Sequence, residues 1–352
     1  MTPAFWRGRS VFITGVTGFK GSWLALLLAH MGARVSGFSL SPPTKPSLFA
    51  DGRLGDIVDW TEGDVRCLDA VSAALERHRP DVVFHLAAQP LVRASYEQPV
   101  ETFATNVMGT VNLLEAVRCS LTTQVVVVVT SDKCYENQPV PGGYREDDRL
   151  GGHDPYAASK ACAELVTSAY RRSWFEHGGP ATVTARAGNV IGGGDWARDR
   201  IVPDVVVALA SRQPAVIRNP SCVRPWQHVL DPLAGYVLLA ERARLSRGEF
   251  NSAWNFGPSS GSVRTVSKLA DEICRQWGDR AEWRHDATAQ VHESLLLTID
   301  SEKARATLGW RPVLEYDQAV AWTTRWYRAV LDGADARPHT ARQIAEYQEL
   351  AA

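Results

Sequence analysis

Short apolar runs alternate with amphipathic stretches along the first half of the chain, the pattern of parallel strands joined by crossover helices. The runs SVFITG, ARVSGFSL, IVDWTEGD, DVVFHLAA and QVVVVVTS predict five strands, ATVTARAGNV a sixth, and WNFGP a late strand that returns to the sheet. Helices are expected near residues 19–31, 67–78, 99–119, 154–177 and 203–211. The pattern predicts an α/β fold, a Rossmann-type doubly wound parallel sheet with a smaller, interleaved α/β substrate-binding domain.

The composition of the sequence changes after Asn189, where the glycine- and charge-rich segment GGGDWARDR is followed by segments interrupted by prolines. We therefore expect a Rossmann domain over residues 1–188, to which residues 230–257 return, and a second domain over 189–229 and 258–340. The polar, alanine-rich residues 341–352 are expected to form a C-terminal tail, either a peripheral helix or a loose segment.

Composition narrows the classes of function. The 38 basic and 39 acidic side chains leave a net charge of -1, so nucleic acid is not an expected partner and any anion site must be local. No apolar run approaches the ~20 residues of a membrane helix, and the N-terminus shows no signal-peptide pattern. The six cysteines form no C-x-x-C pairs, so no metal site is expected and the predicted compartment is the reducing cytoplasm.

A glycine-rich loop follows the first predicted strand directly and opens the first predicted helix. Glycines at such a turn allow a tight bend and a close approach of the backbone to a pyrophosphate, while the helix N-terminus stabilises phosphate charge. This place in the pattern predicts a nicotinamide dinucleotide site. The residues assigned to the loop are Gly15, Thr17, Gly18, Phe19, Lys20 and Gly21.

Further predicted strands end where a dinucleotide would cross the sheet. Asp64 and Val65 close the third strand and are expected to contact the adenine. The second strand ends in GFSLSPP, without an acidic residue for a ribose 2′-hydroxyl or an arginine for a 2′-phosphate, so this position leaves NAD and NADP open. The residues assigned to the cofactor beyond the fourth strand are Leu86, Ala87, Ala88, Gln89 and Asn106.

A catalytic pair is predicted at the start of the helix near 154–177. Tyr156 and Lys160 are four residues apart and share one helix face, so we expect the ammonium to lower the pKa of the phenol. Ser131, at the end of the fifth strand, would bond the substrate hydroxyl or the phenol. The three residues predict hydride transfer with Tyr156 as the base, and Tyr156 and Lys160 are assigned to the cofactor site as well.

With these residues in place, the chain resembles the extended short-chain dehydrogenase/reductase superfamily along nearly its whole length. Within it the chain is similar to the NAD-dependent epimerase/dehydratase family, and among its branches to the dehydratases that act on CDP-glucose. The segments that carry the resemblance are GVTGFKGSWL, SPPTKPSLF, HLAAQPLVRASYEQP, TSDKCYEN, DPYAASKACAE, ARAGNVIGGGDWARDRIVPD, VRPWQHVLDPLAGY, WNFGP and LGWRP.

The resemblance implies a lyase with tightly bound NAD that is regenerated in each turnover. The sugar is oxidised at C4, water is lost across C5 and C6, and the hydride returns to C6. By analogy Asp132 would protonate the departing C6 hydroxyl. The next residue departs from the pattern of the dTDP-glucose enzymes, in which a Glu is the C5 base. Here it is Lys133, which would either act as the base or stabilise the enolate while another group takes the proton.

The substrate end is expected to hold a pyrophosphate, a base and a sugar ring. Arg224 is the favoured partner of the pyrophosphate, with Asn189 as a neutral donor, and Arg218 is placed near the base. His292 and Glu293 are expected to close the pocket. The remaining residues assigned to the substrate are Ser95, Tyr96, Arg200, Gln227 and His228.

Two other functions stay open at this point. A nucleotide-sugar 4-epimerase shares the cofactor loop and the tyrosine–lysine pair but does not need an acid for the C6 hydroxyl. A non-catalytic dinucleotide sensor shares the fold but has no use for a poised phenolate. The resemblance also implies a homodimer, or a tetramer, built on a four-helix interface of the helices near 99–119 and 154–177.

Overall fold

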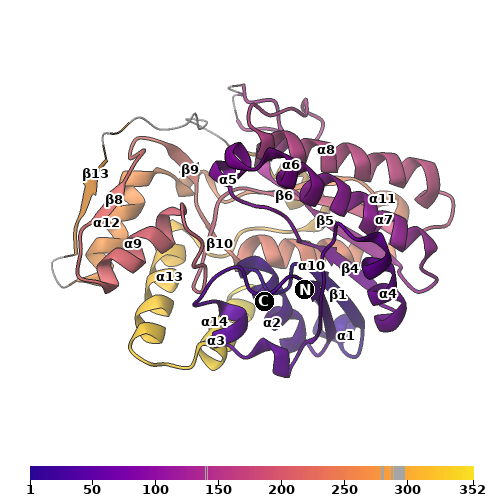
Figure 1. The fold of residues 1–352 in the computed structure, drawn as a ribbon, viewed down its shortest axis with the longest axis horizontal. Coiled ribbons are helices and arrows are strands. Elements are labelled where there is room, and N and C mark those ends of the chain that lie inside the picture. The colour runs from indigo at the N-terminus through magenta and orange to yellow at the C-terminus, as the bar shows by residue number, and fades with distance from the viewer. Residues whose placement is uncertain (139, 141, 279–280, 287, 289–297) are drawn as a thin grey trace.

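The computed structural model describes residues 1–138, 140, 142–278, 281–286, 288 and 298–352. This part of the chain forms a seven-stranded parallel sheet of order β11-β6-β5-β4-β1-β2-β3 (Figure 1). Its strands are β1 (Ser10–Thr14), β2 (Arg34–Ser39), β3 (Asp59–Glu62), β4 (Val82–His85), β5 (Val125–Val129), β6 (Ala181–Ala187) and β11 (Ala253–Phe256). Six of them lie within segments that the apolar pattern predicted, and the late strand β11, which begins one residue before WNFGP, pairs with β6.

Helices cover both faces of the sheet and, with short strand pairs, form the rest of the molecule. They are α1 (Pro3–Trp6), α2 (Phe19–His30), α3 (Leu48–Asp51), α4 (Leu68–His78), α5 (Val92–Glu97), α6 (Pro99–Phe103), α7 (Gly109–Cys119), α8 (Pro155–Tyr170), α9 (Ile201–Ala210), α10 (Leu230–Leu245), α11 (Arg247–Phe250), α12 (Val266–Trp277), α13 (Tyr316–Leu331) and α14 (Ala336–Leu350). The short strand pairs are β7 (Val190–Ile191) with β10 (Gln227–His228), β8 (Ala215–Ile217) with β13 (Trp283–His285), and β9 (Val223–Pro225) with β12 (Val263–Thr265).

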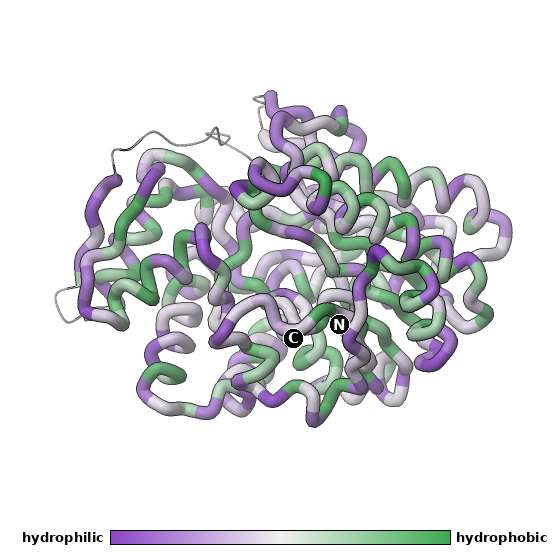
Figure 2. Tube along the Cα trace, in the orientation of Figure 1, coloured by the Kyte–Doolittle hydropathy of each residue, from purple (hydrophilic) through white to green (hydrophobic). Residues whose placement is uncertain are grey.

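The sheet separates two hydrophobic cores because successive side chains of a strand point to opposite faces. Val125 and Val127 of β5 join the core that contains α2 and α10, whereas Val126 and Val128 join the core that contains α4 and α7. A strand buried on both faces is apolar throughout, which explains the unbroken valine run of β5. Hydrophobic and hydrophilic residues alternate along the outer helices, which bury one side only (Figure 2).

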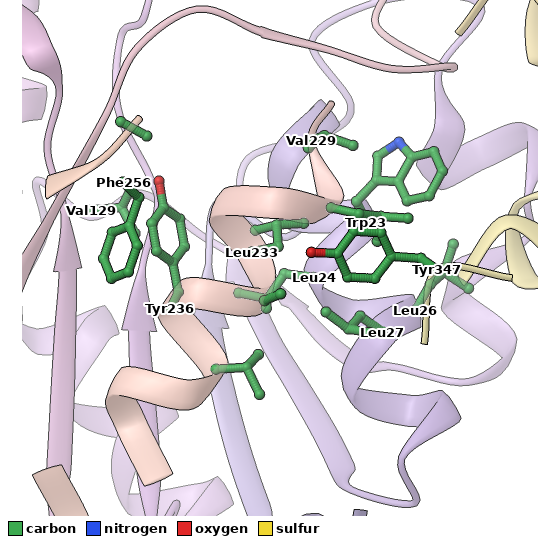
Figure 3. Packing of buried hydrophobic residues seen from close by; sticks show 14 of the residues in the cluster. Trp23, Leu24, Leu26, Leu27, Val129, Val229, Leu233, Tyr236, Phe256 and Tyr347 are labelled. Carbon is green, nitrogen blue, oxygen red and sulfur yellow. The ribbon is translucent and has the colours of Figure 1, made fainter. Parts of the chain in front are cut away.

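Of the two alternatives left open for residues 341–352, a peripheral helix and a loose segment, the structure has the helix. Residues 341–350 belong to α14, which packs on α2 and α3, and Tyr347 is buried in the core beside Leu26 and Leu27 (Figure 3). Ile344 and Tyr347 supply the apolar side of this helix, so tertiary packing and not local composition orders the segment. Among the described residues, no helix has the length and apolar character needed to cross a membrane.

Candidate active site

A cavity of about 910 Å³ lies over the carboxyl ends of the strands. Its wall includes the loops after β1, β2, β3, β4, β5 and β6, together with parts of α9, β8 and β9. Strand order reverses between β1 and β4, so the cavity sits at the switch point where open α/β sheets bind ligands.

The loop between β1 and α2 fits a pyrophosphate. Gly15 has a φ of +72°, and a Cβ there would lie 2.7 Å from the backbone nitrogen of Ala87, so only glycine is accommodated. Gly18 precedes α2 and offers no side-chain cap, which leaves the first N–H groups of this helix to the cavity. The donor set therefore suits the phosphates of a dinucleotide.

The wall continues over the ends of β2 and β3. Ser39, Ser41 and Lys45 line the cavity after β2, where the sequence had suggested no partner for the ribose. Asp64 also lines it, and hydrogen bonds from Arg66 lower the pKa of its carboxyl. This end of the cavity carries hydroxyls and an ionised carboxylate, groups that bond a ribose and an adenine amine.

Of the residues assigned to the cofactor beyond β4, some line the cavity and others do not. Leu86, Ala87 and Ala88 line the cavity. Gln89 and Asn106 lie outside its wall: the backbone N–H of Gln89 donates to Asn106 Oδ1 at 2.8 Å, and Asn106 Nδ2 donates to Ser159 Oγ at 2.8 Å. These hydrogen bonds fasten the loop after β4 to α8, and the assignment of Gln89 and Asn106 to the cofactor stays a prediction.

The predicted catalytic residues converge at the end of β5. Ser131 Oγ donates to Asp132 Oδ1 at 3.0 Å, and the hydroxyls of Ser131 and Tyr156 are hydrogen-bonded. Lys160 Nζ donates to the carbonyl oxygen of Val129 at 3.2 Å, which holds the ammonium against the same strand. All four of these polar side chains, together with Lys133, line the cavity.

Burial controls the ionisation of the pair. It raises the pKa of the Tyr156 phenol to about 12, although Ser131 and Arg200 act in the opposite direction. Burial also lowers the pKa of Lys160 to about 8, with Glu164 opposing it. The prediction that the phenol pKa is lowered is therefore wrong for the protein alone, because desolvation of the phenolate outweighs its favourable neighbours.

Asp132 is the buried acid of the cluster. Its side chain is 2% exposed, and Oδ2 has no hydrogen-bond partner among the described residues. A Cβ on Gly188 would lie 2.9 Å from this oxygen, so the absence of a side chain at Gly188 makes room for the carboxylate. Asp132 Oδ2 is therefore a buried acceptor at the cavity that a hydroxyl of a bound ligand could satisfy.

Lys20 approaches this cluster from the glycine loop. Burial, helped by Arg200 and Lys160, lowers its pKa to about 7, and Nζ lies 3.4 Å from the hydroxyl of Tyr236. Tyr236 stands on α10 beside Val129 and Phe256 (Figure 3). The sequence placed Lys20 in the cofactor loop but did not indicate that its ammonium reaches the catalytic groups.

Arginines beyond β6 line the cavity, among them Arg200, Arg218 and Arg224. Arg200 forms an ion pair with Asp195 at 2.8 Å, and Arg218 pairs with Asp199 and, at 3.4 Å, with Asp204. The predicted substrate residues that line the cavity are Asn189, Arg200, Arg218 and Arg224.

Other predicted substrate residues belong to the scaffold. Gln227 Nε2 donates to the carbonyl oxygen of Phe256 at 3.0 Å, and His228 packs against Trp23 and Trp322. Burial lowers the pKa of His228 to about 3, so the ring is neutral. Both residues are fully buried outside the cavity wall, because β10 turns them toward the core, and their assignment is corrected.

Ser95 and Tyr96 are also outside the wall. Ser95 Oγ accepts from the backbone N–H of Tyr156 at 3.2 Å and donates to the carbonyl of Val92 at 2.6 Å, so it orients the start of α8. Tyr96 is 40% exposed on α5. His292 and Glu293 lie outside the described residues.

Sequence reasoning missed several charged residues of the wall. Arg93, Asp195, Asp199 and Asp204 all line the cavity. The acidic residues stand in or just after GGGDWARDR, and this charge-rich loop between two predicted elements was the available signal. No group of His, Cys, Asp and Glu within the described part of the chain could hold a metal ion.

Fold and cavity together define a dinucleotide-binding protein of the tyrosine–lysine dehydrogenase class. The family model described as GDP-mannose 4,6 dehydratase matches residues 12–323. The chain belongs to this family of nucleotide-sugar 4,6-dehydratases. It is 47% identical over 348 residues to the CDP-glucose 4,6-dehydratase of Salmonella typhimurium, covering 97% of both chains.

Solved structures show the same fold. The Thermus thermophilus UDP-glucose 4-epimerase in complex with NAD aligns with a TM-score of 0.77 at 26% identity, over 90% of this chain and 98% of that one. A double mutant of the Streptomyces venezuelae dTDP-glucose 4,6-dehydratase, with NAD bound, aligns with a TM-score of 0.75 at 26% identity, over 90% and 96%. Dehydratases and epimerases therefore share this scaffold.

Proposed function

We propose that this chain is an NAD-dependent dehydratase that converts CDP-glucose to CDP-4-dehydro-6-deoxyglucose and water. The observation that carries the proposal is the cluster of Ser131, Asp132, Lys133, Tyr156 and Lys160 in one cavity. The 47% identity to a CDP-glucose 4,6-dehydratase supports the same reaction and substrate. A 4-epimerase would need the tyrosine and the lysine but not a buried acid next to them.

NAD would be held by the Gly15–Gly21 loop, by Asp64 and Val65, and by the small residues after β4. Bound there, it would supply the chemistry that amino acids lack, acceptance of a hydride from C4 and its return to C6. Lys160 would bond the ribose beside the phenol. The hydrogen bond of its Nζ to Val129 holds the ammonium in place for this contact.

The protein side chains would move the protons. Tyr156 would take the proton of the C4 hydroxyl. Ser131, which is hydrogen-bonded to the phenol, would assist this transfer. The resulting ketone acidifies the C5 proton, and Lys133, which lines the cavity, would either take this proton or stabilise the enolate while another group takes it. Asp132 would donate a proton to the C6 hydroxyl as it leaves, and its unpaired Oδ2 is the oxygen available for that contact.

The diphosphate of the substrate would lie between Arg200 and Arg224, with Asn189 as a neutral donor, and Arg218 would lie near the base. Arg200 also acts on Lys20 of the cofactor loop and on Tyr156, so the substrate and the cofactor would meet near Tyr156. A reaction on small water-soluble substrates suits the cytoplasm, the compartment proposed from the cysteine pattern.

A homodimer is proposed through α6, α7 and α8, which lie side by side at one end of the molecule (Figure 1). These helices and the turn between α6 and α7 expose large apolar side chains: Val100 (81% exposed), Phe103 (37%), Met108 (50%) and Leu165 (59%). The matching helices of a second copy would cover this surface.

One assay tests the proposal against both alternatives. Purified protein with added NAD is incubated with CDP-glucose, and the alkaline ultraviolet chromophore of a 4-keto-6-deoxy sugar is measured. The chromophore is expected with the native chain and absent with Tyr156→Phe. Formation of CDP-galactose would instead identify an epimerase, and binding without turnover would identify a sensor.

A further inference from the structure

The far end of the cavity has a composition that diphosphate binding does not explain. The loops proposed to bind the cofactor follow β1, β2, β3 and β4, and the proposed catalytic residues lie at the end of β5 and on α8. A nucleotide sugar that reaches Tyr156 must therefore extend toward α9 and the end of β8. The wall there contains Val202, Pro203 and Asp204 of α9 and Val216 and Arg218 at β8.

Asp204 and Arg218 form a pair at this end. Arg218 Nη2 lies 3.4 Å from Asp204 Oδ2, a long contact that leaves both groups with unused hydrogen-bonding capacity. Their side chains are 35% and 27% exposed, so both are partly shielded from water. Asp204 is fixed on the first turn of α9, and the apolar residues Val202 and Val216 also line the cavity.

A carboxylate in an anion-binding cavity opposes the binding of phosphate. Burial raises the pKa of Asp204 to about 6, with Arg218 opposing the rise, so the group is still mostly ionised above neutral pH. Such a charge lowers affinity unless it faces a hydrogen-bond donor of the ligand. The part of a nucleotide sugar that reaches beyond its diphosphate and ribose is the base.

We propose that Asp204, together with Arg218, selects cytosine as the base of the substrate. The carboxylate accepts a hydrogen bond from the N4 amino group, and the guanidinium donates to the N3 or O2 acceptor. Uracil and thymine place an oxygen where cytosine has the amino group, and a carboxylate repels that oxygen. The apolar side chains of Val202 and Val216 are suited to contact the faces of the ring.

Asp199 does not fit this task, although it also lines the cavity and pairs with Arg218. Its carboxylate is held between Arg218 and Arg93, which comes from α5 on the other side of the cavity. Asp199 therefore joins Arg93 to Arg218, whereas Asp204 forms its ion pair with Arg218.

The proposal rests on the proposed function for its substrate, and the experiment separates the two. The native chain, Asp204→Asn and the control Asp199→Asn are compared for kcat/KM with CDP-glucose and UDP-glucose, and for the Kd of CDP and UDP by calorimetry. The native chain is expected to favour the cytidine ligands by roughly 10- to 100-fold, the discrimination of one good polar contact to a base.

Asp204→Asn is expected to bring this ratio close to one, because an amide offers a donor as well as an acceptor. Asp199→Asn is expected to change both affinities together and keep the ratio. Asp204→Glu retains the carboxylate and should keep the sign of the preference, which covers the case in which the Asn variant folds poorly.

Each outcome has one meaning. An unchanged ratio in Asp204→Asn overturns the proposal, and so does a loss of the cytidine preference in Asp199→Asn as large as that in Asp204→Asn. If the native chain binds CDP over UDP and Asp204→Asn removes the preference, but CDP-glucose is not dehydrated, the base-selection proposal stands and the proposed reaction fails.

Discussion

The hydroxyl of Tyr347, near the end of the last helix, donates a hydrogen bond to Asp231 Oδ1 at the start of α10 over 3.0 Å. The backbone N–H of Val313 donates to the same oxygen at 2.7 Å. Tyr347 is 1% exposed, so one buried carboxylate joins α10, the segment before α13 and α14. The end of the chain is thereby part of the core below the cavity.

Replacing Tyr347 by Phe removes this hydrogen bond without changing the shape of the core. The free energy of unfolding is expected to fall by about 1–3 kcal/mol, because Asp231 loses a buried donor. Urea unfolding followed by circular dichroism measures the change. Glu349→Ala, on the exposed side of the same helix, is the control and should stay within about 0.5 kcal/mol of the native chain.

The stability of the protein should also depend on the ionisation of Asp231. Burial raises the pKa of its carboxyl from 3.8 to about 7, although the bonds from Val313 and Tyr347 oppose the shift. The folded state therefore holds a proton that the unfolded chain releases, and this contribution is present below about pH 4 and lost as the pH rises through about 7.

Asp231→Asn should lack this dependence. Between about pH 4 and 7, the native chain is expected to lose stability relative to the variant by at most about 1.4 kcal/mol per pH unit. Unfolding free energies of both proteins at several pH values give the difference. Parallel profiles would show that the carboxyl does not titrate in this range.

Tyr156→Phe tests the acid–base role of the phenol. The rate of dehydration is expected to fall by about 10²- to 10⁴-fold, the usual contribution of a positioned proton-transfer group. The Kd of NAD, measured by protein fluorescence, should change little, because the ring and the helix that carries it remain. A large loss of NAD affinity would instead make the residue a cofactor contact only.

Lys133→Met separates the two roles open to this lysine. If Lys133 takes the C5 proton, solvent deuterium is no longer incorporated at C5 of the product, and turnover is lost with it. Mass spectrometry of product formed in D₂O provides the measurement. Undiminished uptake would remove Lys133 from the proton transfer, and Lys133→Arg, which retains the charge, then tests stabilisation of the enolate.

The apolar surface of α6 gives the last prediction. Introducing Asp at Val100 or Phe103 should convert a dimer to a monomer in sedimentation experiments, because a charge would be buried at the centre of the interface. Leu121→Asp places the same charge at a residue that is 98% exposed on a loop outside these helices, and should leave the mass unchanged. A monomeric native chain would contradict the proposed interface.

Much of the site was predictable because its parts are local. The glycine loop stands directly between β1 and α2, and Tyr156 and Lys160 are one helical turn apart, so neighbouring residues determine their relative positions. The ionisation of the phenol was not predictable in this way. Its pKa depends on how completely the folded chain removes water from it, and that follows from packing of segments far apart in the sequence.

Position on a strand explains the residues that were wrongly placed. Gln227 and His228 belong to a substrate-like segment, but β10 pairs with β7 and turns them into the core. Arg224, three residues earlier, lines the cavity. Arg224 belongs to a different strand, β9, and both residues of β10 are buried, so the packing of these short strands and not their order in the sequence decides which side chains reach the cavity.

The sequence by itself determined the order of strands and helices, the dinucleotide loop and the identity of the catalytic groups, because these depend on periodicity and short spacing. Tertiary structure alone decided that Asp204 meets Arg218, that Lys20 reaches the catalytic cluster and that Tyr347 closes the core. Such contacts join residues whose separation along the chain carries no information about their distance in space, so they exist only once the sheet and its helices have packed.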